Sequence, residues 1–192
     1  GTHTCVILEF EPADTRLYCF GNQEGGRLGN GLVSGFSSVP VPVDTSALGL
    51  SGGTWSGLGA GGVHSGAFYS GDLATLVGWG NRRALGFLGG DEIAPTPSLA
   101  NPVSFWLTAF GKGHVCATSL DGSSLLCGGY NSHGQTGAEP VGEGIVTEFD
   151  AVEFQPLGTL PSFPGLAVGD RHTCFVHQYK NNGLKRKLFC MG

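Results

Sequence analysis

Four stretches of the chain share one pattern, in which two short, mostly apolar runs flank a polar turn. The turns fall at residues 12–14, 70–72 and 121–122, and in the fourth stretch at Asn182 and Gly183, midway between Cys174 and Cys190. An Asn-Gly pair between two such runs is the strongest short signal of a tight β-hairpin. The pattern therefore predicts four antiparallel hairpins, near residues 1–21, 61–80, 111–129 and 169–192.

The connections between these hairpins are long and contain proline. Prolines occur in residues 39–43 (Val-Pro-Val-Pro-Val), 94–102 and 154–164. Because proline lacks a backbone N–H, a strand that contains it is tolerated only at the edge of a sheet. Each connection is thus expected to add an outer strand. Glycine and proline interrupt nearly every window that has a helical period, so no helix is predicted.

Short motifs recur with the hairpins and make the chain an internal repeat. A histidine precedes the first strand of each copy, and the positions are His3, His64, His114 and His172. A glycine-bounded turn follows the second strand, with GRLG at 26–29, GFLG at 86–89 and GQTG at 134–137, while the fourth copy ends at Gly192. A repeat of this length is typical of propeller blades or another repeat array.

The six cysteines align within the repeats. Copies one, three and four have a cysteine two residues after the histidine and another on the return strand, whereas copy two has Gly66 and Gly78 at these positions. Loss of both positions together is what a covalent pair requires, because one remaining thiol would be unpaired. The alignment favours three disulfides across hairpins: Cys5 with Cys19, Cys116 with Cys127, and Cys174 with Cys190.

Disulfides persist only in an oxidising compartment, so they place the protein outside the cytosol. One alternative is a cytosolic protein with six buried thiols, since free cysteine packs well in cores. A zinc site is the other alternative. The chain has no CxxC motif, and the separations within the pairs do not match the usual spacing of zinc ligands.

Composition and charge exclude several classes of protein. Glycine supplies 35 of 192 residues and charged residues only 13%, which is typical of a turn-rich β fold, and 40% apolar residues argue against disorder. The net charge of -5 argues against a nucleic-acid binder. No apolar run is long enough to span a membrane. The chain lacks an initiator Met and starts within a repeat, so we expect it to be processed or a fragment of a longer chain.

No pattern of a catalytic centre is present, because the GxSxG, HExxH and Walker motifs are all missing. We expect no catalysis, cofactor or metal. The four repeat histidines occur once per copy in a fixed context, which predicts a structural role in which they bond backbone groups within the blade. His133 and His177 lie outside this register and are interpreted as surface residues. Residues 139–153 are interpreted as a solvated acidic loop, and the basic residues of 180–187 as a solvated turn.

The combination G-x-x-H-T-C, hairpin, L-Y-C-W-G, then G-Q-L-G resembles the repeat of the regulator of chromosome condensation family, particularly its cysteine-bearing secreted members. GTHTC, LYCFG and GRLG match in copy one, GKGHVC and GQTG in copy three, and GDRHTC and LFCMG in copy four. The resemblance implies an all-β fold over residues 1–192: a partial β-propeller of four-stranded blades, with about three to four blades of an expected seven. Such a partial ring exposes edges and blade faces that further chain or a partner must cover.

We therefore expect an extracellular or cell-surface module that acts structurally or by binding proteins within a larger assembly. Its expected partners are other protein chains or the remaining blades of the same protein. Two alternatives follow from the resemblance. One is a regulator of nucleotide exchange on a small GTPase, as in the founding member of the family, and the other is a secreted protein inhibitor of a hydrolase.

Overall fold

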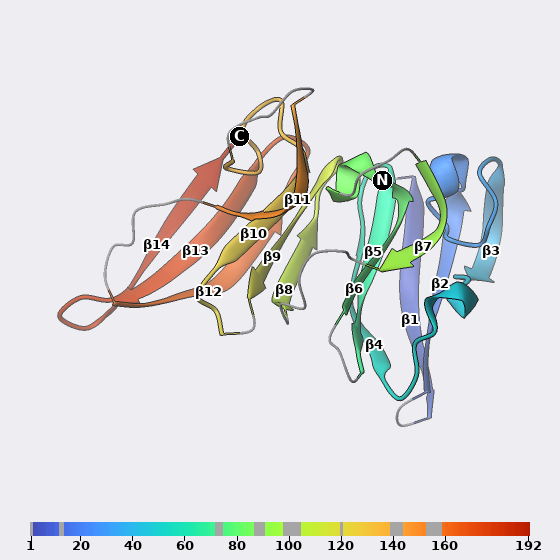
Figure 1. Cartoon of the computed structure of the whole chain (residues 1–192), viewed down its shortest axis with the longest axis horizontal. Coiled ribbons are helices and arrows are strands. Elements are labelled where there is room, and N and C mark those ends of the chain that lie inside the picture. Colours follow the sequence, from blue (N-terminus) through green and yellow to red (C-terminus); the bar gives the residue numbers. More distant parts are fainter. Residues whose placement is uncertain are drawn as a thin grey trace.

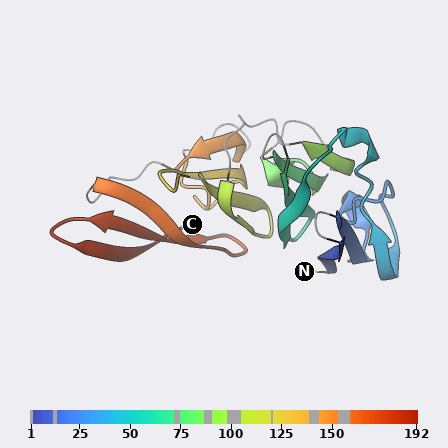
Figure 2. The same ribbon diagram turned by 90° about the horizontal axis from the view of Figure 1, so that it is seen from below.

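The structure, a computed structural model, describes residues 2–11, 14–71, 75–86, 91–97, 105–119, 121–138, 144–152 and 159–192; side chains are not described at 91–97, 106, 147–150 and 159–161. Within these ranges the chain forms β-strands and three short 3-10 turns, and no α-helix. The strands build four antiparallel sheets that follow one another along an arc, from the N-terminal sheet to the C-terminal one (Figures 1 and 2). No helix in the described ranges is long and apolar enough to cross a membrane.

Each sheet is one blade, and the blades are numbered 1 to 4 along the chain. Blades 2 and 3 have four strands each, whereas the described parts of blades 1 and 4 have three. The strands are β1 (His3–Glu11), β2 (Asp14–Asn22) and β3 (Phe36–Pro42) in blade 1; β4 (Thr54–Ala60), β5 (His64–Ser70), β6 (Thr75–Asn81) and β7 (Asp91–Pro97) in blade 2; β8 (Phe105–Phe110), β9 (His114–Ser119), β10 (Leu125–Tyr130) and β11 (Ile145–Ala151) in blade 3; and β12 (Thr159–Val168), β13 (Thr173–Lys180) and β14 (Leu184–Met191) in blade 4. The all-β, partial-propeller fold expected from the sequence is confirmed.

The predicted hairpins coincide with β1–β2, β5–β6, β9–β10 and β13–β14. Their registers place Cys5 opposite Cys19, Cys116 opposite Cys127, and Cys174 opposite Cys190. In blade 2 the same register places Gly66 opposite Gly78. Asn182 and Gly183 both have positive φ angles, 50° and 121°, which is the backbone conformation that favours Asn-Gly in a two-residue hairpin turn.

Two of the three proline-containing connections supply the expected outer strand. β3 and β7 each lie at the edge of their sheets, and residues 98–102 lie outside the described part. The prediction for residues 154–164 is wrong in its described part, because β11 is the outer strand of blade 3 and residues 159–164 begin β12, the first strand of blade 4. β12 is also an end strand and pairs only with β13, with register shifts from Thr159 to Gly165. Proline thus indicates that a strand lies at the edge of a sheet, but it does not indicate whether that strand is the first or the last of its blade.

The glycine-bounded turn of blade 2 also differs from the sequence alignment. Residues 83–86 (RALG), rather than GFLG, occupy the position of GRLG in blade 1. Leu85 is as fully buried as Leu28, and Gly86 has a positive φ of 77° like the 67° of Gly29. The loop before this turn is two residues shorter in blade 2. Matching the glycines of GFLG to those of GRLG therefore aligned the two repeats in the wrong register. Residues 87–89 lie outside the described part.

The hydrophobic core lies between the blades, in three seams. Seam 1–2 is filled by Leu17, Leu28, Trp55 and Trp79, with Cys19 at its side. Seam 2–3 contains Leu76, Leu85, Phe105 and Val115. Seam 3–4 contains Cys116, Cys127, Leu125, Phe163 and Phe175. Because apolar burial is the main favourable term in folding, each blade depends on its neighbour for stability.

One glycine lies at the end of the second hairpin strand of every repeat, where this strand passes the start of the first hairpin strand. Gly21, Gly80, Gly129 and Gly192 all have φ between 92° and 117°. A Cβ on any of them would lie 2.7 to 2.8 Å from the Cα of the repeat histidine of the same blade. Only glycine satisfies both the positive φ and the close backbone approach.

Replacement of one such glycine tests this constraint. Gly129→Ala should lower the free energy of unfolding by more than about 3 kcal/mol, since a left-handed backbone costs about 1–2 kcal/mol and overlap with fixed backbone adds a similar amount. The matched control is Gly134→Ala, where φ is 76° but nothing lies within 4 Å of the added Cβ. Its cost should stay near 1–2 kcal/mol. Urea denaturation measures both, and equal losses would contradict the role of the close approach.

Candidate functional site: the seams and the open face

The repeat histidines lie at the start of the first hairpin strand of each blade: His3, His64 and His114 begin β1, β5 and β9, and His172 directly precedes β13. His3, His64 and His114 are buried in seams 1–2, 2–3 and 3–4, whereas His172 in blade 4 is exposed. The backbone of the turn before the histidine is fixed by a hydrogen bond from Gly61 N to His64 O, and the same bond recurs from Gly111 to His114 and from Gly169 to His172.

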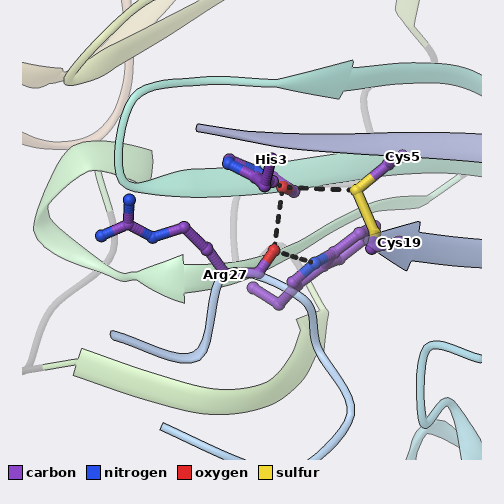
Figure 3. Close-up of a disulfide and its surroundings, with 6 residues drawn as sticks. His3, Cys5, Cys19 and Arg27 are labelled. Carbon is purple, nitrogen blue, oxygen red and sulfur yellow. Dashed lines mark hydrogen bonds between the residues drawn. A yellow bond between two sulfur atoms is a disulfide. The ribbon is translucent and has the colours of Figure 1, made fainter. Parts of the chain in front are cut away.

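In seam 1–2 a serine of blade 2 connects the histidine, the disulfide and the glycine-bounded turn of blade 1 (Figure 3). His3 Nε2 lies 2.7 Å from Ser65 Oγ, and Ser65 Oγ donates to the backbone carbonyl of Arg27 at 3.2 Å. Since the hydroxyl hydrogen goes to that carbonyl, His3 Nε2 carries a hydrogen and donates to the serine. Trp79 Nε1 donates to the same carbonyl at 3.1 Å, and Cys5 Sγ lies 3.7 Å from the hydroxyl.

Seam 3–4 repeats this network with a threonine. His114 Nε2 lies 2.8 Å from Thr173 Oγ1, which donates to the carbonyl of Gln135 at 2.8 Å and lies 3.6 Å from Cys116 Sγ. Ser65 and Thr173 are each the residue after the repeat histidine of the following blade. The partner of the histidine is therefore a hydroxyl of the next blade, rather than a backbone group within its own blade as expected from the sequence.

Seam 2–3 is built differently. Val115 stands where Ser65 and Thr173 have hydroxyls, and within the described residues both ring nitrogens of the fully buried His64 lack a hydrogen-bond partner. The ring of Phe110 lies 5.9 Å from that of His64. A Cβ on Gly66 would lie 2.7 Å from Cε1 of Phe110. The aromatic ring thus occupies the space over Gly66, and a Cβ on Gly78 would lie 2.6 Å from Cδ1 of Leu85. Neither position leaves room for a cysteine side chain.

The buried histidines are neutral at pH 7. Burial is the main cause that lowers the pKa of His3 and His114 to about 4 and that of His64 to about 3. His177 was interpreted as a surface residue, but the structure buries it completely, with its ring 5.5 Å from Phe163 and 5.4 Å from Tyr179. Burial lowers the pKa of His177 as well. His177 points to the same side of β13 as Thr173 and Phe175, toward blade 3, and this alternation was the signal that the sequence offered.

The sulfur atoms of all three expected cysteine pairs lie at bonding distance. The S–S distances are 2.06 Å for Cys5–Cys19, 2.06 Å for Cys116–Cys127 and 2.11 Å for Cys174–Cys190. The following blade covers the first two bridges, whereas Cys190 is exposed. No group of three or more metal-ligating side chains gathers in the described ranges.

Blade 4 presents a face whose counterpart in blade 3 is buried. In blade 3, Cys116, Cys127, Thr118 and Leu125 are at most 1% exposed, because blade 4 packs on them. The corresponding residues of blade 4 are Cys174, Cys190, Val176 and Leu188, and Leu188 is 65% exposed. Together with His172 they form the open face of blade 4. An apolar surface of this kind beside an unpartnered seam position indicates a site of protein contact.

No protein-family model matches the sequence, and no curated protein matches it. Solved structures match over most of the chain: human WBSCR16 (TM-score 0.70, 17% identity, 92% of this chain and 44% of that one), Prp20 of Saccharomyces cerevisiae (0.62, 20%, 85% and 38%) and the ectodomain of the Arabidopsis thaliana receptor kinase ACR4 (0.52, 16%, 100% and 48%). Prp20 is yeast RCC1. These similarities show that the fold is that of an RCC1-like propeller. The chain spans less than half the length of each of these proteins.

The burial of the seam histidines predicts a pH dependence of stability. Unfolded histidine takes a proton near pH 6.5, whereas the folded groups resist protonation down to pH 4 or 3. Stability is therefore complete above pH 6.5 and falls as the pH drops toward 4.5, by up to about 1.4 kcal/mol per pH unit for each histidine. Urea denaturation between pH 7 and 4.5 measures this slope, in a range above the ordinary pKa of carboxyl groups.

The substitution His64→Phe tests how much of this pH dependence of stability comes from His64. The ring has no hydrogen-bond partner to lose, so the variant should match the wild type at pH 7 and show a slope smaller by up to about 1.4 kcal/mol per pH unit. An unchanged slope in His64→Phe would contradict the assignment.

Proposed function

We propose that the chain is an extracellular or cell-surface propeller module that binds other proteins within a larger assembly and catalyses no reaction. The observation that carries this proposal is the open face of blade 4. Its seam positions have the chemistry of a buried interface, yet Leu188 and Cys190 are exposed and Cys174 and Val176 are only partly buried, so a further blade or another protein is expected to cover them. A sheet face that carries Leu188, Val176 and a disulfide gains free energy when another surface removes it from water, at about 25 cal/mol per Å² of apolar area.

The extracellular setting is supported by the cysteines. In the described ranges no cysteine is free, and each pair bridges the two strands of one hairpin. Three bridges in a chain of this size are typical of proteins from oxidising compartments. Each closes a loop of only 11 to 16 residues, so it stiffens its own hairpin rather than linking distant parts of the chain.

Protein binding is also a property of one of the similar proteins, Prp20. It is bound to Kap60 in one structure, and another concerns its binding properties to Gsp1p and histones. These partners belong to Prp20. For this chain the shared fold supports a surface that binds proteins, while nucleotide exchange on a GTPase and inhibition of a hydrolase remain alternatives that no described residue cluster favours.

The compartment is tested by mapping the thiols of the protein isolated from its natural source under non-reducing conditions. No thiol should react with an alkylating reagent, and three disulfide-linked peptides should be found. Under mild reduction, Cys174–Cys190 should open first, because Cys190 is exposed whereas Cys116 and Cys127 are at most 1% exposed. Six free thiols in the native protein would overturn the extracellular proposal.

The binding surface is tested by screening the protein against a panel of secreted proteins and cell-surface ectodomains. Leu188→Asp should weaken binding of a partner from this panel at least about tenfold, since it puts a charge into the centre of the contact. Leu32→Asp is the matched control, because Leu32 is similarly exposed (58%) but lies in blade 1. Absence of any binder, or a binder that does not distinguish the two variants, would overturn the proposal.

A further inference from the structure

A pocket of about 240 Å³ opens at the end of seam 3–4 where the histidine turns lie. The turns before His114 and His172 and the loop after β10 line it. The polar side chains on its wall are Lys112, Tyr130, Ser132, His133, Gln135, Asp170 and Arg171. Only Gln135 belongs to the histidine and hydroxyl network of the seam, through its backbone carbonyl, so that network does not account for the other side chains.

The equivalent place in seam 1–2 is filled by Arg27. Its Nη1 donates to Thr2 Oγ1 at 3.1 Å and to the carbonyl of Gly62 at 3.3 Å, and thereby bridges the turns of blades 1 and 2. Gln135 occupies the position of Arg27, since the carbonyls of both accept the seam hydroxyl. Its shorter side chain turns back, and Oε1 accepts from His133 N at 2.8 Å. The pocket is open because glutamine replaces the arginine that closes its counterpart.

Hydrogen-bond donors and positive charge dominate the wall. Lys112 Nζ lies 3.4 Å from Asp170 Oδ2, so this pair is close to neutral and Arg171 supplies a net positive charge. This is opposite in sign to the net charge of -5 of the chain. A second cation in the pocket would be repelled, and Gly113 stands where Thr2 accepts the hydrogen bond of Arg27. The pocket therefore does not offer another arginine the site that Arg27 has.

The loop orients a hydroxyl donor toward this charge. Arg171 Nη1 lies 3.3 Å from His133 Nε2, and a guanidinium only donates, so Nε2 is the acceptor and the ring hydrogen is on Nδ1. Nδ1 then donates to Ser132 Oγ at 2.9 Å. The hydrogen of the Ser132 hydroxyl is left to donate elsewhere. A guanidinium and a hydroxyl on one wall match the two oxygens of a carboxylate.

We propose that this pocket binds a carboxylate side chain, Asp or Glu, on an acidic segment of a partner protein. This inference rests on the proposed protein-binding function and names one of its contact sites. Arg171 is the main ligand, Ser132 donates the second hydrogen bond, and Lys112 keeps Asp170 from repelling the carboxylate.

The test uses the whole chain and three probes: an acetylated, amidated peptide with glutamates in its centre, the same peptide with glutamines, and the same peptide with lysines. Calorimetry at 0.15 M salt should detect binding of the glutamate peptide alone. Loss of a charge-assisted bond should weaken it at least about tenfold in Arg171→Gln.

Arg186→Gln is the matched control, because Arg186 is an exposed cation on β14 whose Nε bonds Gln178 Oε1 at 2.7 Å. It should bind the glutamate peptide as the wild type does. Equal weakening in both arginine variants, binding of the glutamine or lysine peptide, or displacement of the glutamate peptide by inorganic phosphate at equal concentration would each overturn the inference. If the peptides fail while a partner sensitive to Leu188→Asp exists, the pocket assignment is wrong and the proposed function stands.

Discussion

In two of the three seams the arrangement of the blades depends on one hydroxyl group, which is placed directly after the turn histidine of the following blade. In seams 1–2 and 3–4 this hydroxyl accepts a hydrogen bond from the histidine, donates one to the glycine-bounded turn, and lies against the disulfide. All of these groups are buried, and a buried polar group without a partner costs about 1–3 kcal/mol. All hydrogen bonds of the network form only when the two blades are in one relative position. The network therefore fixes how one blade sits against the next, which apolar packing alone specifies less precisely.

Seam 2–3 shows what replaces this network when its members are absent. The hydroxyl becomes Val115, both cysteines become glycine, and the ring of Phe110 enters the space over Gly66. The changes fit together, because any one alone would leave a cavity or an overlap. Their cost is the polar ring of His64, which remains buried without a hydrogen-bond partner in the described ranges. Seams 1–2 and 3–4 are thus filled by a hydroxyl network and a disulfide, whereas seam 2–3 is filled by an aromatic ring.

Much of this fold follows from the sequence, because its determinants are local. The Asn182-Gly183 turn and the alternation of strand residues set the hairpins, and loss of both cysteines from one copy indicated their pairing. What lies between blades was not predictable. The hydroxyl partner of His3 is 62 residues away, His177 is buried against Phe163 and Phe189 on the other strands of its sheet, and residues 159–164 were interpreted as an outer strand although they start the next sheet. The sequence of one repeat does not indicate which residues of another repeat pack against it.

The pocket at seam 3–4 shows how such a repeat acquires a binding site without losing its scaffold. The carbonyls of Arg27 and Gln135 perform the same structural task, so the backbone at this position is fixed while the side chain is not. In seam 1–2 the side chain closes the gap between two turns, and in seam 3–4 it withdraws and leaves the turn residues 112, 170 and 171 around a cavity. Because the hydroxyl network carries the stability of the seam, the residues at its mouth are free to differ from blade to blade. The mouth of each seam is therefore where specificity can arise, whereas the histidine and the glycine at the end of the second hairpin strand recur in all four repeats.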